Sequence, residues 1–110
     1  MKVLRSLLTV AFLALPLHVF GSQITATHTA VNITTDSTLV SSGPRALLII
    51  QNDSDTDMYC NVAGGAAVLG QGLRLLANGG AFGFDVAVPK GAIHCIHNGT
   101  GNKVLLVTEG

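Results

Sequence analysis

The chain has 110 residues, and its six Lys and Arg balance six Asp and Glu, so the formal net charge is zero at neutral pH. With no excess of positive charge and no basic stripe, we expect no nucleic-acid partner. Charged residues make up only 11% of the chain, against about a quarter in an ordinary soluble domain, so we expect neighbouring molecules to cover much of the surface.

Residues 1–22 have the pattern of an export signal. The basic residues Lys2 and Arg5 precede an apolar run over 7–15. The small residues Gly21 and Ser22 follow it, and we predict that the signal is cleaved after one of them. The competing interpretation, an uncleaved membrane anchor, needs roughly 20 continuous apolar residues, and this run is shorter. We therefore expect an exported protein that is extracellular, periplasmic or virion-associated, with no membrane span after cleavage.

Residues 23–110 are expected to form a single small domain. Short apolar runs alternate with clusters of Gly, Pro, Asn, Asp and Ser, and no helical periodicity appears. The predicted strands, in chain order, are 24–33, 37–40, 45–51, 58–62, 72–76, 80–86, 92–97 and 103–108. Short strands at nearly regular spacing predict an all-β fold, a small antiparallel β-sandwich that is jelly-roll-like or Greek-key.

Two predicted strands are apolar on both faces, over 46–50 and 104–107. A two-layer sandwich buries only one face of each, so something must cover the other. Loops or the first strand could cover it within the domain; otherwise the strands meet another subunit, and for that contact we predict four residues: Leu48, Ile50, Val104 and Leu106. The first strand is a ribbon of Thr and small residues that can pair within the domain or with a neighbour's sheet edge.

Cys60 and Cys95 are the two cysteines of the chain. In an exported protein an even number of cysteines predicts a disulfide, and alternation along each strand points both sulfurs into one core. Such a bridge would stabilise the domain by roughly 3 to 4 kcal/mol in the chain-entropy model. Two buried free thiols are the alternative.

Asp53, Asp55 and Asp57 alternate in the way that carboxylates do in a Ca²⁺ loop. The EF-hand pattern fails, because Met58 stands where the turn needs Gly and Gly64 where a bidentate Glu belongs. We therefore favour a solvated turn whose polar side chains bond to their own backbone, and Ca²⁺ binding remains the minor interpretation.

The segment His94-Cys95-Ile96-His97 holds residue types that bind zinc. On a strand, however, His94 points to one face while Cys95 and His97 point to the other, so one ion cannot easily take both histidines. We predict no metal site here, an inward Cys95, and histidines at the exposed face and the end of the strand.

No catalytic motif is present. Residues 70–75 begin like a dinucleotide fingerprint but lack its third glycine and its helix, and the sole Glu, Glu109, lies in the C-terminal tail. We predict that the protein is not an enzyme and uses no cofactor. Asn32, Asn52 and Asn98 fit the glycosylation acceptor pattern, which matters only in a eukaryotic host.

From Arg45 to Gly110 the order of strand and turn patterns resembles small β-sandwich proteins encoded among bacteriophage structural genes. The segments that carry the resemblance are 44–54, 58–67, 72–75, 79–80, 88–93 and 105–110. The resemblance implies a virion-associated or appendage-associated role, multimeric packing and no cofactor. An export signal and a cysteine pair depart from that pattern, and a phage product assembled at the envelope or a bacterial surface fibre subunit accommodates them better.

The leading hypothesis is therefore an exported structural protein that self-associates in a virion or surface appendage. The alternative is a secreted binding module for surface carbohydrate or another protein, using the loop from Asp53 to Asp57 with Tyr59. Its weakness is the scarcity of aromatic rings, which sugar sites usually need. A small hydrolase has no assignable nucleophile.

Overall fold

The computed structural model describes residues 25–110, and the predicted export signal lies outside them. The strands are β1 (Thr27–Ile33), β2 (Thr38–Ser41), β3 (Leu48–Asn52), β4 (Met58–Asn61), β5 (Leu73–Leu75), β6 (Ala81–Phe84), β7 (Ile93–His97) and β8 (Lys103–Glu109). Every strand expected from the sequence is present, with its ends within three residues of the predicted ones. Among the described residues no helix is long and apolar enough to cross a membrane.

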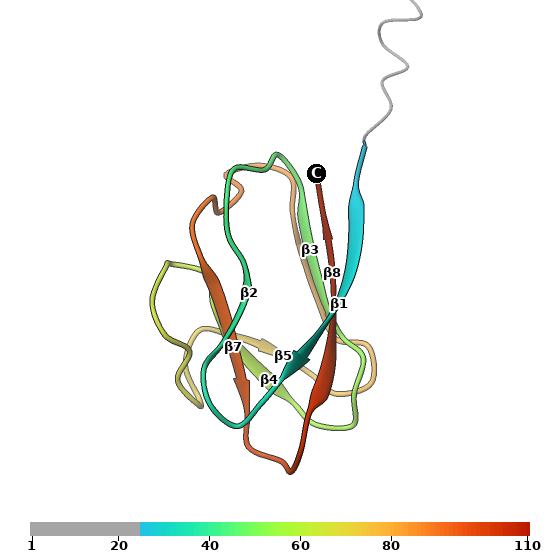
Figure 1. Ribbon diagram of the computed structural model, residues 1–110, viewed down its shortest axis with the longest axis vertical. Coiled ribbons are helices and arrows are strands. Elements are labelled where there is room, and N and C mark those ends of the chain that lie inside the picture. The colour runs from blue at the N-terminus through green and yellow to red at the C-terminus, as the bar shows by residue number, and fades with distance from the viewer. Residues whose placement is uncertain (1–24) are drawn as a thin grey trace, which may run out of the picture.

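The strands form two antiparallel sheets of four (Figure 1). Sheet A has the order β1-β8-β3-β6, and sheet B has the order β2-β7-β4-β5. The first strand pairs with the eighth, the second with the seventh, the third with the sixth and the fourth with the fifth, as in a long hairpin rolled into two layers. This order is that of a jelly roll, so the predicted β-sandwich is confirmed in its jelly-roll form.

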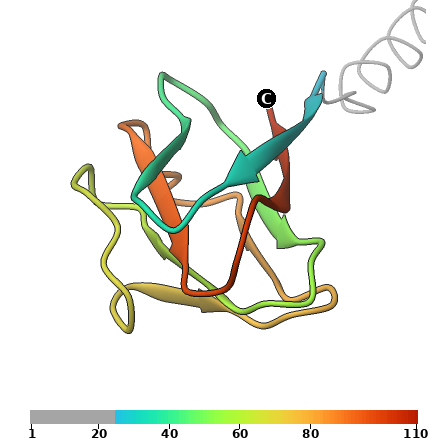
Figure 2. The same cartoon turned by 60° about the horizontal axis from the view of Figure 1, so that its bottom comes forward.

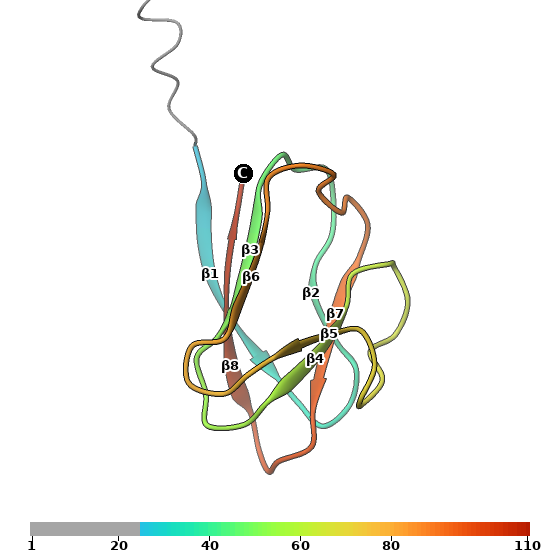
Figure 3. The same cartoon turned by 180° about the vertical axis from the view of Figure 1, so that it is seen from behind.

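The two layers face each other across a common core. The tilted view of Figure 2 shows β2 and β7 in one layer and β1, β3 and β8 in the other, and the view from behind shows β6 beside β3 (Figure 3). Alternation places every second side chain of β3, β4 and β7 in the core. The core consists of Ile33, Leu48, Ile50, Met58, Cys60, Leu75, Ile93, Cys95, Leu105 and Val107.

Two polar side chains, Asn52 and His97, are completely buried. The Asn52 amide donates to the carbonyls of Thr56 at 2.7 Å and Leu75 at 2.9 Å, so it ties the β3–β4 turn to β5. The Nδ1 atom of His97 accepts the N–H of Gly99 at 3.0 Å, and Nε2 lies 2.9 Å from the carbonyl oxygen of Ile33. A neutral ring with its proton on Nε2 satisfies both contacts.

The expectation that His97 lies at an exposed strand end is therefore wrong. The side chain points inward with Cys95, as the alternation required, and its two ring nitrogens replace the hydrogen bonds that water would have made. His94 is only partly buried and projects to the opposite face of β7, as predicted. Burial of His97 thus ties the end of β7 to the end of β1.

Candidate interaction surface

The outer face of sheet A carries no charged side chain on its strands. Pairing aligns the outward residues in rows across the four strands, and one such row runs from Ala30 through Leu106 and Gln51 to Ala81. The outward residues on these strands are His28, Ala30, Asn32, Ile49, Gln51, Ala81, Gly83, Val104, Leu106 and Thr108. None of them is Asp, Glu, Lys or Arg, which makes this face unlike an ordinary solvated sheet.

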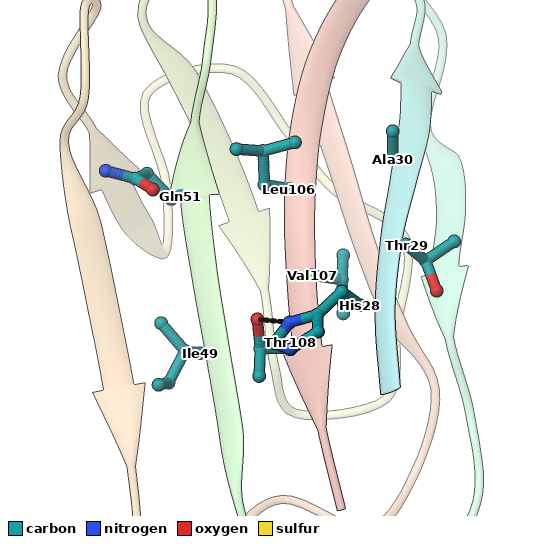
Figure 4. A pocket seen from close by; sticks show the side chains of 8 residues that line it. All are labelled: His28, Thr29, Ala30, Ile49, Gln51, Leu106, Val107 and Thr108. Carbon is teal, nitrogen blue, oxygen red and sulfur yellow. Dashed lines mark hydrogen bonds between the residues drawn. The ribbon is translucent and has the colours of Figure 1, made fainter. Parts of the chain in front are cut away.

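A shallow hollow of about 360 Å³ lies in this face (Figure 4). Leu106 stands between Gln51 and Ala30 on one side of it, and Ile49 and Thr108 lie on the other. The hollow is closed beside β1 by a side-chain contact of 2.9 Å between His28 Nδ1 and Thr108 Oγ1.

A second hollow of about 250 Å³ shares Ile49 with the first and continues toward β6. Gly83 and Phe84 line it, and Asp85, just beyond the end of β6, stands at its rim. The two hollows share Ile49, and apart from Asp85 neither is lined by Asp, Glu, Lys or Arg.

The four residues predicted for a subunit contact divide between the two sides of sheet A. Leu48 and Ile50 are completely buried in the core, so their assignment to a contact surface is wrong. Val104 is half-buried and Leu106 is 37% exposed, and both face outward. Because the side-chain period of a strand is two, an error of one residue in β3 exchanges the faces, and Ile49 takes the outward place.

The polar residues of β3 indicate only in part which face of the strand is buried. Gln51 shares the outward face with Ile49, which points to the correct assignment. Asn52, however, shares the inward face with Leu48 and Ile50 and is itself buried. A buried amide with all its partners supplied by the fold looks in the sequence like a surface residue.

The predicted disulfide is present between Cys60 and Cys95. The two residues are direct partners in the β4–β7 pairing, and 1% or less of each is exposed. The bridge therefore joins neighbouring strands of sheet B inside the core. A disulfide of this kind persists in a non-reducing environment, which agrees with an exported protein.

A buried arginine holds one end of the sandwich together. Arg45 donates from Nη1 to the carbonyl of Pro89 at 2.6 Å, from Nη2 to that of Gly91 at 3.1 Å, and from Nε to Glu109 Oε1 at 3.2 Å. Ser41 also donates its hydroxyl to the Glu109 carboxylate. In Figures 1 and 3 the β2–β3 and β6–β7 connections meet at this end.

The contact between Arg45 and Glu109 was not predicted, because Pro89, Gly91 and Glu109 lie between 44 and 64 residues from Arg45 in the chain. The Glu109 carboxylate on β8 thus accepts hydrogen bonds from the Ser41 hydroxyl and the Arg45 guanidinium. Arg45 makes its bonds with a side chain that is 2% exposed. These interactions connect the segment at Arg45 with the segment from Pro89 to Gly91 and with the end of β8.

The Asp53 to Asp57 turn uses two of its carboxylates in ion pairs. Asp55 contacts Lys103 Nζ at 2.7 Å, and Asp57 contacts Arg74 Nη2 at 2.6 Å. Hydrogen bonds from Lys103 and from the Thr56 hydroxyl lower the pKa of Asp55, and those from Arg74 and the Ala77 N–H lower the pKa of Asp57. Within residues 25–110 no three His, Cys, Asp or Glu side chains gather as metal ligands do.

Tyr59, the aromatic residue assigned to the predicted sugar-binding loop, has a guanidinium over its ring. The guanidinium of Arg74 lies 5.9 Å from the centre of the Tyr59 ring, and Asp57 accepts a hydrogen bond from Arg74.

The glycine-rich segment after β4 ends in a turn before β5, where Gly70 and Gly72 have φ of +80° and +87°. A strand follows this turn, whereas a dinucleotide fingerprint continues into a helix.

The three glycosylation patterns differ in accessibility. Asn32 and Asn98 are exposed, whereas Asn52 is completely buried with its amide bonded. Asn52 therefore serves the fold.

No protein-family model, curated protein or solved structure matches the chain.

Proposed function

We propose that the chain is an exported structural subunit that self-associates in a virion or an extracellular appendage. The observation that carries the proposal is the outer face of sheet A, where ten outward residues of the four strands include none of Asp, Glu, Lys or Arg. A solitary domain in water normally carries charges on such a face. A subunit that buries this face against its neighbours has no need of them.

The strand order gives further support. Jelly rolls serve as viral capsid domains and as lectins, so the fold suits a coat or fibre subunit without deciding between these uses. The buried Cys60–Cys95 bridge suits a protein that works outside a reducing cytoplasm. The signal pattern of residues 1–22 supplies a route to that location.

Expression of the full chain in a bacterial host tests the proposal. Mass spectrometry of the exported product should give a mass that corresponds to cleavage after Gly21 or Ser22. Light scattering across a wide concentration range should then give a mass above that of one subunit, and electron microscopy should show particles or filaments. A product that stays monomeric at all concentrations would contradict the proposal.

A matched pair of variants locates the contact. Leu106→Glu places a charge in the uncharged face and should lower the assembled mass, because burying an unpaired carboxylate is costly. Leu69 is similarly exposed, at 43% against 37% for Leu106, but lies in the loop between β4 and β5. Leu69→Glu should therefore leave the mass unchanged, and equal effects of the two variants would move the contact away from sheet A.

The alternative of a carbohydrate-binding module has little support from the residues assigned to it. Asp55 and Asp57 are held by cations, and Arg74 covers the Tyr59 ring. On this reasoning the purified protein gives no hits on a glycan array in buffer that contains Ca²⁺. Saturable glycan binding that Tyr59→Ala abolishes would restore the alternative.

A further inference from the structure

One edge of the sandwich lacks the features by which proteins protect sheet edges. β1 is an edge strand of sheet A and pairs with β8 along all seven of its residues. Its other side has no strand beside it among the described residues. From Thr27 to Ile33 it contains no charge, no proline and no register shift. Such an edge is a template for another strand.

The three other edges are shorter and carry some protection. β2 has a register shift between Leu39 and Ser41, and β5 has only three residues with Arg74 at its centre. β6 has four residues, and an exposed Asp85 follows it. Ile33 is buried and its carbonyl contacts His97 Nε2, but the six residues from Thr27 to Asn32 still offer about 20 Å of backbone, so β1 presents the longest open row of N–H and C=O groups.

We propose that β1 pairs with β1 of a second copy of this chain, antiparallel about a two-fold axis, so that two A sheets join into one. The inference rests on the proposed self-association and names the edge through which it begins. A two-fold contact uses the same surface on both copies, so that surface must complement itself. A backbone edge meets this requirement, because an antiparallel neighbour offers the donors and acceptors that the first copy also offers.

The side chains of β1 complement one another in the register that is centred on Ala30 and pairs residues 28–32. Ala30 then lies on the axis beside its own copy, Thr29 faces Val31 and His28 faces Asn32. Thr29 with Val31 is a pair of β-branched residues, which cross-strand contacts favour. No charged side chain is brought against another, and the uncharged outer face of sheet A continues across the junction.

Ala30 and Ala81 provide a matched test. Both are exposed alanines on the outer face of sheet A, in the same row of paired residues, but Ala30 lies on β1 and Ala81 on the opposite edge, β6. A charge at either position harms contacts through the face alike. Only a charge at Ala30 places two like charges side by side in the proposed pairing.

Sedimentation of the exported protein, of Ala30→Lys and of Ala81→Lys should separate these effects. We expect Ala30→Lys to raise the dimer dissociation constant at least about tenfold more than Ala81→Lys does, since like charges in contact across an interface are strongly unfavourable. Under mild oxidation Ala30→Cys should form a covalent dimer, whereas Ala81→Cys should not. The native cysteines do not interfere, because they are paired and buried.

Equal weakening by both lysine variants would overturn the β1 pairing and leave a contact through the face alone. A dimer that neither variant weakens would place the contact elsewhere. In both cases the proposed self-association survives. A wild-type protein that is monomeric throughout would overturn both proposals, and cross-linking of Ala81→Cys as fast as Ala30→Cys would overturn the assignment of the edge.

Discussion

Reduction of the Cys60–Cys95 bridge should remove a large part of the stability of the domain. The bridge joins residues 35 apart in the sequence. In the chain-entropy model, closing a loop of that length in the unfolded chain stabilises the folded state by about 3.8 kcal/mol at 25 °C. Domains of this size are stable by about 5 to 15 kcal/mol in total, so reduction is expected to remove between about a quarter and three quarters of the stability.

Urea denaturation followed by circular dichroism measures the effect. With a slope of about 1 kcal/mol per molar urea, full reduction should lower the unfolding midpoint by roughly 3 to 4 M. Both sulfurs are buried, so reduction is expected to be slow until urea opens the domain. In the double variant Cys60→Ala with Cys95→Ala, the reductant should have no effect.

Equal midpoints for the oxidised and reduced protein would refute this reasoning. Alkylation of both cysteines in the exported protein without prior reduction would also refute it, since a bridged pair has no free thiol to react.

Three further outcomes follow from contacts elsewhere in the domain. Arg45→Met should lower the free energy of unfolding by about 3 kcal/mol, because it removes the cation that pairs with Glu109 and the donor of three carbonyl groups. Arg74→Met, which breaks an exposed pair, should cost much less in the same denaturation assay. In the folded state Arg74 and the Ala77 N–H lower the pKa of Asp57. The stability that ionised Asp57 adds is therefore present above its ordinary pKa of 3.8 and is lost as the pH falls below that value. Asp57→Asn should therefore flatten the dependence of the melting temperature on pH in that acid range, and an unchanged slope would contradict the role of Arg74. Gly72→Ala should destabilise the domain far more than Gly70→Ala, because both glycines have positive φ but only at Gly72 does an added Cβ collide with the backbone oxygen of Cys60; equal melting temperatures for the two variants would contradict this.

The strands were predictable because the local signals agree. Alternating apolar residues mark β4 and β7, and Gly and Asn clusters mark the turns between strands. The same alternation predicted that Cys60 and Cys95 face one core. These are signals within a few residues, which a single sequence contains.

The parts that could not be predicted depend on contacts between distant segments. In β3, where Leu48, Ile49 and Ile50 are all apolar, nothing local decides which face is buried, and packing against sheet B decides it. The Arg45 contacts and the burial of His97 likewise need partners supplied by other strands and loops. Of the four residues predicted for a subunit contact, Leu48 and Ile50 were therefore assigned to the wrong side of sheet A.

The strand order also governs when the domain can fold. Of its six strand pairings, only that of β4 with β5 joins neighbours in the sequence, and β8 supplies the partner of both β1 and β3. Folds dominated by such distant pairings form slowly, because large loops must close before native contacts compensate for the lost entropy. Sheet A cannot assemble until residues 103–109 have been made. The domain as a whole therefore completes its fold only after nearly all of the chain has been synthesised.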